Sequence, residues 1–131
     1  MTQILIIDDS EEFRATTEEI LVDAGYQVAA TSSLEEAEPI LENSPPDLIL
    51  CDLVMPVSDD EELKEESGSA VAGAHAIQRI SKLKPGVPIV AISGNVPSEA
   101  LKAIAGFGAV ESLEKPFSRD KLLNVVKRLV G

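Results

Sequence analysis

Short apolar runs of four to five residues alternate along this chain with longer segments in which apolar residues recur every three or four positions. That alternation is typical of repeated strand–helix units whose parallel sheet is buried on both faces. The pattern predicts five strands, at about residues 3–7, 27–30, 47–51, 88–92 and 109–113. The second run is the least apolar, and it is assigned mainly from its place between two helical segments.

Caps and breakers delimit the predicted helices. The first begins at the N-cap Ser10 and ends at Gly25, a residue typical of the position just after a helix. The second begins at Ser33, where Glu36 completes a capping box, and it contains Pro39, which is expected to kink or shorten it. Three more helices are predicted, from about residue 74 to the Pro85-Gly86 pair, from residues 97–98 to about 106, and from residue 118 onward. On the first helix, the residues predicted to form the inward face are Phe13, Thr17, Ile20, Leu21 and Ala24. On the third helix, they are Ile77, Ile80 and Leu83.

The predicted architecture is α/β, with five strand–helix units wound into one doubly wound parallel sheet of strand order 2-1-3-4-5. The length of 131 residues suits a single domain over residues 1–131. Residues 57–69 interrupt the periodic pattern with six acidic residues, one lysine and no apolar period, so an acidic loop is predicted after the third strand. Two roles for this loop stay open, namely shielding of the neighbouring site and docking of a basic partner.

Chemically reactive or ligating residues follow several of the apolar runs, namely Asp8, Asp9, Asp52, Ser93 and Lys115. In the predicted sheet the first and third strands are neighbours, and ligands bind in the crevice between their carboxyl ends. Three carboxylates at that point repel one another unless a cation is present, and Mg²⁺ is the hard ion that such a set accommodates. The alternative that Asp8 and Asp9 merely cap the first helix stays open, although Ser10 already offers a cap.

Composition limits the classes of partner. Acidic residues number 23 against 11 basic ones, a net charge of −12, which disfavours binding to nucleic acids and to anionic membranes. No apolar run approaches the length of a membrane span, and the first residues lack the pattern of a signal peptide, so a cytoplasmic location is expected. Cys51 is the one cysteine in the sequence and excludes an internal disulfide; inside an apolar run it is expected to be a buried, inert thiol.

The motifs resemble, in their order, those of the receiver domain of two-component response regulators, and the resemblance covers nearly the whole chain. It rests on the Asp8-Asp9 pair, the Asp52-Leu-Val-Met-Pro56 motif, the Ala91-Ile92-Ser93-Gly94 motif and the Lys115-Pro116-Phe117 motif. The resemblance implies a flavodoxin-like (βα)₅ fold, in agreement with the architecture predicted above.

The same resemblance implies a function in phosphorelay signalling. Asp52 would accept a phosphoryl group from the phosphohistidine of a sensor histidine kinase or phosphotransfer protein, and Ser93 and Lys115 would contact that group. The implied Mg²⁺ ligands are Asp8, Asp9, Asp52 and the backbone carbonyl of Val54. Phosphorylation would then change contacts with a downstream protein target or effector domain. Beyond its own phosphoryl transfer and dephosphorylation, such a domain is not an enzyme.

Two features depart from the family pattern. Ser112 stands where the family usually has an aromatic switch residue, and about 13 extra residues separate Pro56 from Gly73. A receiver-like interaction module that does not switch is therefore an alternative. A phosphatase of the haloacid-dehalogenase type is a more distant one, because the Asp-x-Asp pattern on the first strand and a cap domain are missing. Whether the receiver acts alone or belongs to a longer protein, and its oligomeric state, stay open.

Overall fold

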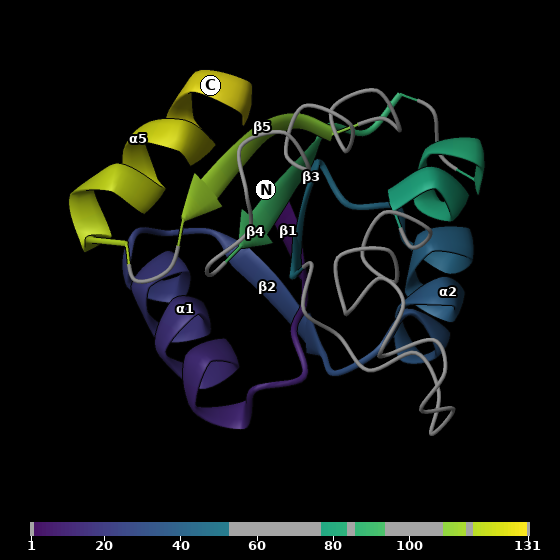
Figure 1. The fold of residues 1–131 in the computed structure, drawn as a ribbon, viewed down its shortest axis with the longest axis horizontal. Helices are drawn as coiled ribbons and strands as arrows, with labels where there is room; N and C mark the ends of the chain where they lie inside the picture. Colours follow the sequence, from purple (N-terminus) through teal and green to yellow (C-terminus); the bar gives the residue numbers. More distant parts are fainter. Residues whose placement is uncertain (1, 53–76, 84–85, 94–108, 115–116, 131) are drawn as a thin grey trace, which may run out of the picture.

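The computed structural model describes residues 2–52, 77–83, 86–93, 109–114 and 117–130. Its centre is a five-stranded parallel sheet in the order β2-β1-β3-β4-β5, which confirms the predicted topology (Figure 1). The strands are β1 (Gln3–Ile7), β2 (Gln27–Thr31), β3 (Leu48–Asp52), β4 (Ile89–Ser93) and β5 (Ala109–Glu114).

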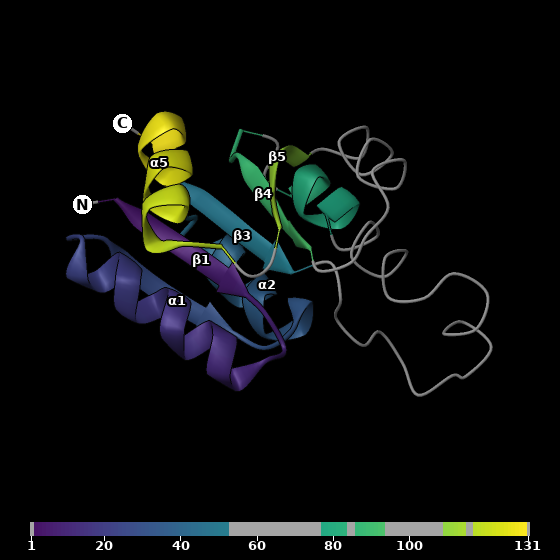
Figure 2. The same ribbon diagram turned by 60° about the vertical axis from the view of Figure 1, so that its left-hand side comes forward.

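Helices cover both faces of this sheet. On one face lie α1 (Glu11–Asp23) and α5 (Arg119–Val130), and on the other lies α2 (Leu34–Asn43) beside a helical segment at residues 77–83 (Figures 1 and 2). An ion pair between Arg79 and Glu38 joins that segment to α2. None of the helices that the structure describes combines the length and the apolar character that crossing a bilayer requires.

Alternation of side chains along β1 divides the core into two layers. Leu5 and Ile7 belong to the cluster that includes α2 and residues 77–83, whereas Ile4 and Ile6 belong to the cluster that includes α1 and α5. Successive side chains of a strand point to opposite faces of the sheet. Because both faces are covered, all four residues are at most 1% exposed, and this explains why all four are apolar.

The strands that follow β1 each end one residue later than the apolar pattern predicts. Their last residues, Thr31, Asp52, Ser93 and Glu114, are polar, so hydrophobicity alone did not include them. The backbone ladder nevertheless continues, since Thr31 is in register with Ile7, Asp52 with Ile92 and Ser93 with Glu114. Backbone pairing is indifferent to side-chain polarity, and it therefore carries polar residues to the last rung of the sheet.

The predicted ends of α1 are confirmed. The Ser10 side chain accepts a hydrogen bond from the Phe13 backbone N–H at 3.3 Å, as an N-cap does. Gly25 follows the helix with a φ of +101°, a left-handed conformation that residues with a Cβ rarely adopt. Ala24, which was predicted to face inward, is exposed, because it is the C-cap and not an interior position of the helix.

The predicted capping box at the start of α2 is half right. Ser33 accepts a hydrogen bond from the Glu36 N–H at 3.2 Å, but the Glu36 carboxylate accepts from the N–H and hydroxyl of Ser32, one residue before the N-cap. These hydrogen bonds lower the pKa of Glu36. The helix then runs unbroken through Pro39 to Asn43. The predicted helix that ends near residue 106, and the first residues of the one predicted from residue 74, lie outside the described residues.

Burial makes Val90 a sharp test of the two-layer core. Val90 on β4 is fully buried, whereas Val22 on α1 is 55% exposed. Val90→Ala is expected to lower the free energy of unfolding by about 2 kcal/mol, because it removes buried methyl groups and leaves a cavity. The matched change Val22→Ala is expected to alter it by less than about 0.5 kcal/mol. Urea unfolding measures both, and equal losses would contradict the assignment of Val90 to the core.

Candidate functional site: an acid cluster at the carboxyl edge of the sheet

Three carboxylates converge where β1 and β3 end. One oxygen each from Asp8, Asp9 and Asp52 lies within 4.8 Å of the others. The parallel register causes this, because Ile7 is paired with Cys51 and the next residues along the two strands are Asp8 and Asp52. The sequence-based prediction that these three side chains meet is thus confirmed. Among the described residues, this is the group of side chains that could hold a metal ion.

Hydrogen bonds fix Asp8 from both neighbouring elements. Its backbone N–H donates to the carbonyl of Thr31 at 3.0 Å, and its backbone carbonyl accepts from the Arg14 guanidinium at 2.8 Å. Its carboxylate oxygen Oδ1 accepts from the backbone N–H of Ser10 at 2.9 Å. Asp8 therefore both contributes to the acid cluster and anchors the turn that leads into α1.

The end of β2 forms part of the same support. Thr31 is 5% exposed, and its hydroxyl donates to the carbonyl of Ile6 at 2.8 Å. Arg14 and Thr31 were not singled out from the sequence, although both hold the backbone around Asp8. A lone arginine on a helix and a threonine at a strand end carry no motif, so their contacts could be found only from the folded chain.

Like charges meet at this corner of the protein. Asp8 and Asp52 are at most 1% exposed, while Asp9 is open to solvent. Two unit charges about 4 Å apart repel by roughly 4 kcal/mol at an effective dielectric constant near 20. Such a set of hard oxygen donors suits a divalent cation, which removes the repulsion.

Cys51 lies beside the cluster but is not part of its chemistry. The thiol is fully buried and contacts the backbone carbonyl of Asp52 at 3.8 Å. Burial, followed by the charges of Asp52 and Asp8, raises the pKa of the Cys51 thiol from 9.0 to about 12. The thiol therefore stays protonated at neutral pH, which agrees with the expectation of an inert cysteine.

A change of register between β4 and β5 brings Ser93 level with Glu114. Ile89 is paired with Ala109 but Val90 with Glu111, so Val110 is an extra residue in β5, and it is 58% exposed. Ser93 is the last residue of β4, at the same edge of the sheet as Asp52. The predicted site residues Val54 and Lys115 lie outside the described residues.

Ser112 is exposed on β5, in register with Ala91. The position at which the family pattern has an aromatic ring therefore carries a small polar side chain that is open to solvent.

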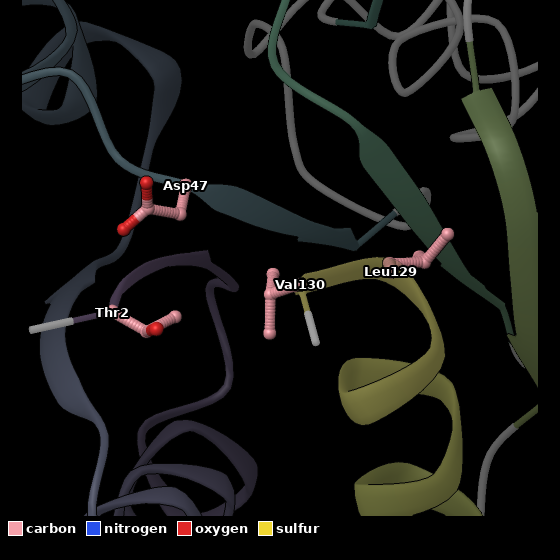
Figure 3. Close-up of a pocket in the computed structure, with 4 residues that line it drawn as sticks. All are labelled: Thr2, Asp47, Leu129 and Val130. Carbon is pink, nitrogen blue, oxygen red and sulfur yellow. The ribbon is translucent and has the colours of Figure 1, made fainter.

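A pocket of about 470 Å³ lies at the opposite edge of the sheet. Thr2, which precedes β1, and Asp47, which precedes β3, line it together with Leu129 and Val130 of α5 (Figure 3). Five-residue strands separate this pocket from the acid cluster by roughly 16 Å. The pocket therefore takes no part in the chemistry of the cluster.

Known proteins match this chain over nearly its whole length. A family model for the response regulator receiver domain matches residues 4–127. An NtrX-like response regulator of Rickettsia bellii is 29% identical over 128 residues, which make up 98% of this chain and 24% of that protein. The chain thus spans about a quarter of the length of this relative.

Solved structures of similar chains share the fold. The receiver domain of NtrX from Brucella abortus is 27% identical, with a TM-score of 0.82 and 97% of each chain covered. A CheY-like receiver domain protein from Methanospirillum hungatei JF-1 is 25% identical, with a TM-score of 0.82, over 98% of this chain and 92% of that one.

Charge repulsion in the cluster predicts opposite effects of Asp8→Asn with and without a divalent cation. Without one, the substitution is expected to raise the free energy of unfolding by about 1–2 kcal/mol, because it removes a like charge. With saturating Mg²⁺, the wild-type protein is expected to gain about 1–3 kcal/mol and the variant much less. Urea unfolding in EDTA and in Mg²⁺ measures the free energy of unfolding without and with the cation. Asp47→Asn, at the far edge of the sheet, serves as the control, and an equal Mg²⁺ gain in all three proteins would contradict the prediction.

The raised pKa of Cys51 predicts a pH-dependent loss of stability. The unfolded thiol loses its proton near pH 9, whereas the folded thiol keeps it to about pH 12. The contribution of the thiol to the free energy of unfolding is therefore constant below pH 9. Above pH 9 it falls, by up to about 1.4 kcal/mol per pH unit. Between pH 8 and pH 10.5, the free energy of unfolding should fall more steeply with pH for the wild type than for Cys51→Ala. Parallel slopes would show that the thiol ionises alike in both states.

Proposed function

The chain belongs to the family of response regulator receiver domains, as its strand-end motifs predicted, and on that basis we propose that Asp52 is its phosphoacceptor. The donor is the phosphohistidine of a sensor histidine kinase or of a phosphotransfer protein. The phosphorylated domain then changes its contacts with a downstream protein target or effector domain. Residues 1–131 act as one receiver domain, with residues 57–69 as an insertion after β3.

The observation that carries this proposal is the convergence of Asp52 with Asp8 and Asp9 at one edge of the sheet. A carboxylate at the end of a strand is a competent nucleophile for a phosphoryl group, provided that the negative charges around it are offset. The neighbouring carboxylates are ligands for the ion that offsets them. The cluster thus combines an acceptor and a metal site within 4.8 Å.

The donor set fits Mg²⁺, which prefers one or two carboxylates and bridges to phosphate oxygens. Asp8, Asp9 and Asp52 would hold the ion together with the backbone carbonyl of Val54. When bound, Mg²⁺ supplies positive charge that lessens repulsion between the carboxylates and an incoming phosphoryl group. Hydrogen bonds that Asp8 accepts from Ser10 and Arg14, and one that its N–H donates to the Thr31 carbonyl, keep one of these ligands in place.

In the transfer step, an oxygen of the Asp52 carboxylate attacks phosphorus as the bond from phosphorus to the donor imidazole nitrogen breaks. An acyl phosphate forms on Asp52, and the imidazole leaves with the electron pair of the broken bond. The hydroxyl of Ser93 and the ammonium group of Lys115 interact with the phosphoryl oxygens, where charge develops. Hydrolysis of the acyl phosphate by water returns Asp52 to its carboxylate form.

A receiver-like module without a switch is the second candidate. The exposed Ser112 favours it, because a small polar side chain cannot move a ring into and out of a cavity. The candidates differ in outcome, since a silent module does not gain a phosphoryl group on Asp52. Membership of the receiver family argues against the phosphatase of the haloacid-dehalogenase type.

Asp52→Asn tests the proposed acceptor. The wild-type protein, incubated with acetyl phosphate and Mg²⁺, is expected to gain one phosphoryl group by intact mass, because a small donor can replace the phosphohistidine. Asp52→Asn is expected to gain none, since the amide lacks a nucleophilic oxygen anion. The matched control Asp47→Asn keeps the gain.

The same assay separates the alternatives. No adduct on the wild-type protein at any Mg²⁺ concentration would overturn the proposal in favour of the silent module. Rapid multiple turnover of a phosphomonoester would instead indicate a phosphatase. Chelation of Mg²⁺ with EDTA is expected to prevent the adduct, and an adduct formed equally well in EDTA would contradict the proposed metal.

A further inference from the structure

Arg14 stands at a position of α1 that is unfavourable for a cation. It is the only basic residue of this helix, which carries five acidic ones, and it is the fourth residue from the amino end. The helix dipole favours negative charge at that end and disfavours positive charge there. The reason for an arginine at this position must therefore lie outside the helix.

The side chain of Arg14 is held against the acid cluster. Its Nη1 donates to the backbone carbonyl oxygen of Asp8 at 2.8 Å, in a partly buried contact. The carbonyl and the carboxylate of one aspartate are only a few bonds apart, so the guanidinium lies within roughly 8 Å of the Asp8 carboxylate. Asp9 and Asp52 each place an oxygen within 4.8 Å of that carboxylate. The positive charge of Arg14 thus lies beside the cluster.

The hydrogen bond of Arg14 and its charge act on different parts of Asp8. The bond ends on the backbone carbonyl, and two other contacts already hold this residue, namely those with the Thr31 carbonyl at 3.0 Å and the Ser10 N–H at 2.9 Å. A neutral donor would serve as a third anchor. The charge acts through space on the carboxylates, and those of Asp8 and Asp52 are almost completely buried, where salt and water screen charges weakly.

The charge of Arg14 is also felt at the start of α2. Hydrogen bonds from Ser32 are the main reason why the pKa of Glu36 is lowered, and the charge of Arg14 lowers it further. Glu36 is exposed, whereas Asp8 and Asp52 are buried. Since charges interact more strongly where water is excluded, the acid cluster gains more from a nearby cation than Glu36 does.

We propose that Arg14 is a resident counter-charge of the acid cluster, which stabilises the metal-free domain and makes Mg²⁺ bind less tightly. The inference rests on the metal site of the proposed function. A fixed cation beside the carboxylates offsets part of their mutual repulsion before a metal ion arrives. The same charge repels an incoming divalent ion. Arg14 thus sets the Mg²⁺ concentration at which the site fills, and with it the range in which Asp52 accepts a phosphoryl group.

A double-mutant cycle in EDTA separates the charge of Arg14 from its hydrogen bond. Arg14→Met removes both but keeps an unbranched side chain. Asp8→Asn removes only the charge of the partner, because the backbone carbonyl that accepts the hydrogen bond stays. Arg14→Met is expected to lower the free energy of unfolding of the wild type, and to lower that of Asp8→Asn by about half as much. Equal losses in urea unfolding would overturn the inference, since Arg14 would then act through its hydrogen bond alone.

The Mg²⁺ affinity, measured by calorimetry, is the second readout, and its sign separates two roles of Arg14. Arg14→Met is expected to bind Mg²⁺ about three- to tenfold more tightly than the wild type, because a repelling charge near the site is removed. Arg14→Lys keeps the charge on a long stem and is expected to stay within about twofold of the wild type. Weaker binding by Arg14→Met would show that Arg14 chiefly holds Asp8 in place, and would overturn the inference.

Arg128→Met is the matched control, because it changes the net charge of the protein by the same amount. Arg128 forms an ion pair with Glu111 of β5, and its neighbours Leu129 and Val130 line the pocket at the opposite edge of the sheet. This variant is expected to keep the Mg²⁺ affinity within about twofold of the wild type, since exposed charges far from the cluster are screened. A gain equal to that of Arg14→Met would reduce the effect to net charge and overturn the inference.

The outcomes distinguish this inference from the function on which it rests. If the wild-type protein binds no Mg²⁺, the proposed metal site fails and the inference fails with it. If Mg²⁺ binds as expected but Asp52 gains no phosphoryl group, the proposed acceptor fails and the inference stands. If the wild type binds Mg²⁺ and is phosphorylated, but Arg14→Met binds Mg²⁺ no more tightly, the inference alone is overturned. If Arg14→Met does not fold in EDTA, Arg14→Gln, a neutral donor, replaces it in both measurements.

Discussion

The parallel pairing of β1 with β3 is the constraint on which the site depends. With Ile7 opposite Cys51, the two strands deliver Asp8 and Asp52 to neighbouring positions, and the turn into α1 adds Asp9. Two of these carboxylates are almost completely buried. A folded chain that keeps like charges so close sacrifices stability unless a cation and directed hydrogen bonds offset the repulsion. A phosphoryl acceptor beside a metal requires the same arrangement. The loss of stability and the proposed chemistry therefore both arise from the pairing of β1 with β3.

The rest of the fold holds that corner in place. Two aliphatic core layers sandwich the sheet, and the polar contacts at the carboxyl edge connect separate elements. Thr31 joins β2 to β1, Arg14 joins α1 to the end of β1, and the contact of Phe13 with Phe117 joins α1 to the start of α5. Ion pairs on the outside, such as Arg119 with Asp23, are exposed and contribute little. Geometry at the site therefore depends on buried contacts between elements and hardly on surface charge.

Local pattern predicted most of the secondary structure, and the rule that ligands bind where neighbouring strands of a doubly wound sheet end predicted the acid cluster. Continuous apolar runs identified buried parallel strands, and Ser10 and Gly25 marked the ends of α1. The errors came where backbone pairing or a neighbouring residue overrode the pattern. Polar Asp52 extends β3 by one residue, and Ala24 is exposed at a helix end. The Glu36 carboxylate accepts a hydrogen bond from the N–H of Ser32 and not from that of the N-cap Ser33. None of these follows from hydrophobicity, since each depends on where backbone donors point.

The amino-acid sequence by itself determined the positions of the strands along the chain, the residue types at their ends and the resemblance to receiver domains, because each of these depends on local periodicity and on the spacing of motifs. Tertiary structure alone decided that three carboxylates lie within 4.8 Å, that Arg14 and Thr31 hold Asp8, and that Phe13 meets Phe117. These residues are separated in the chain by as many as 104 positions, from 13 to 117. Contacts of that range form only when separate strand–helix units pack together, and no local rule records which side chains then meet.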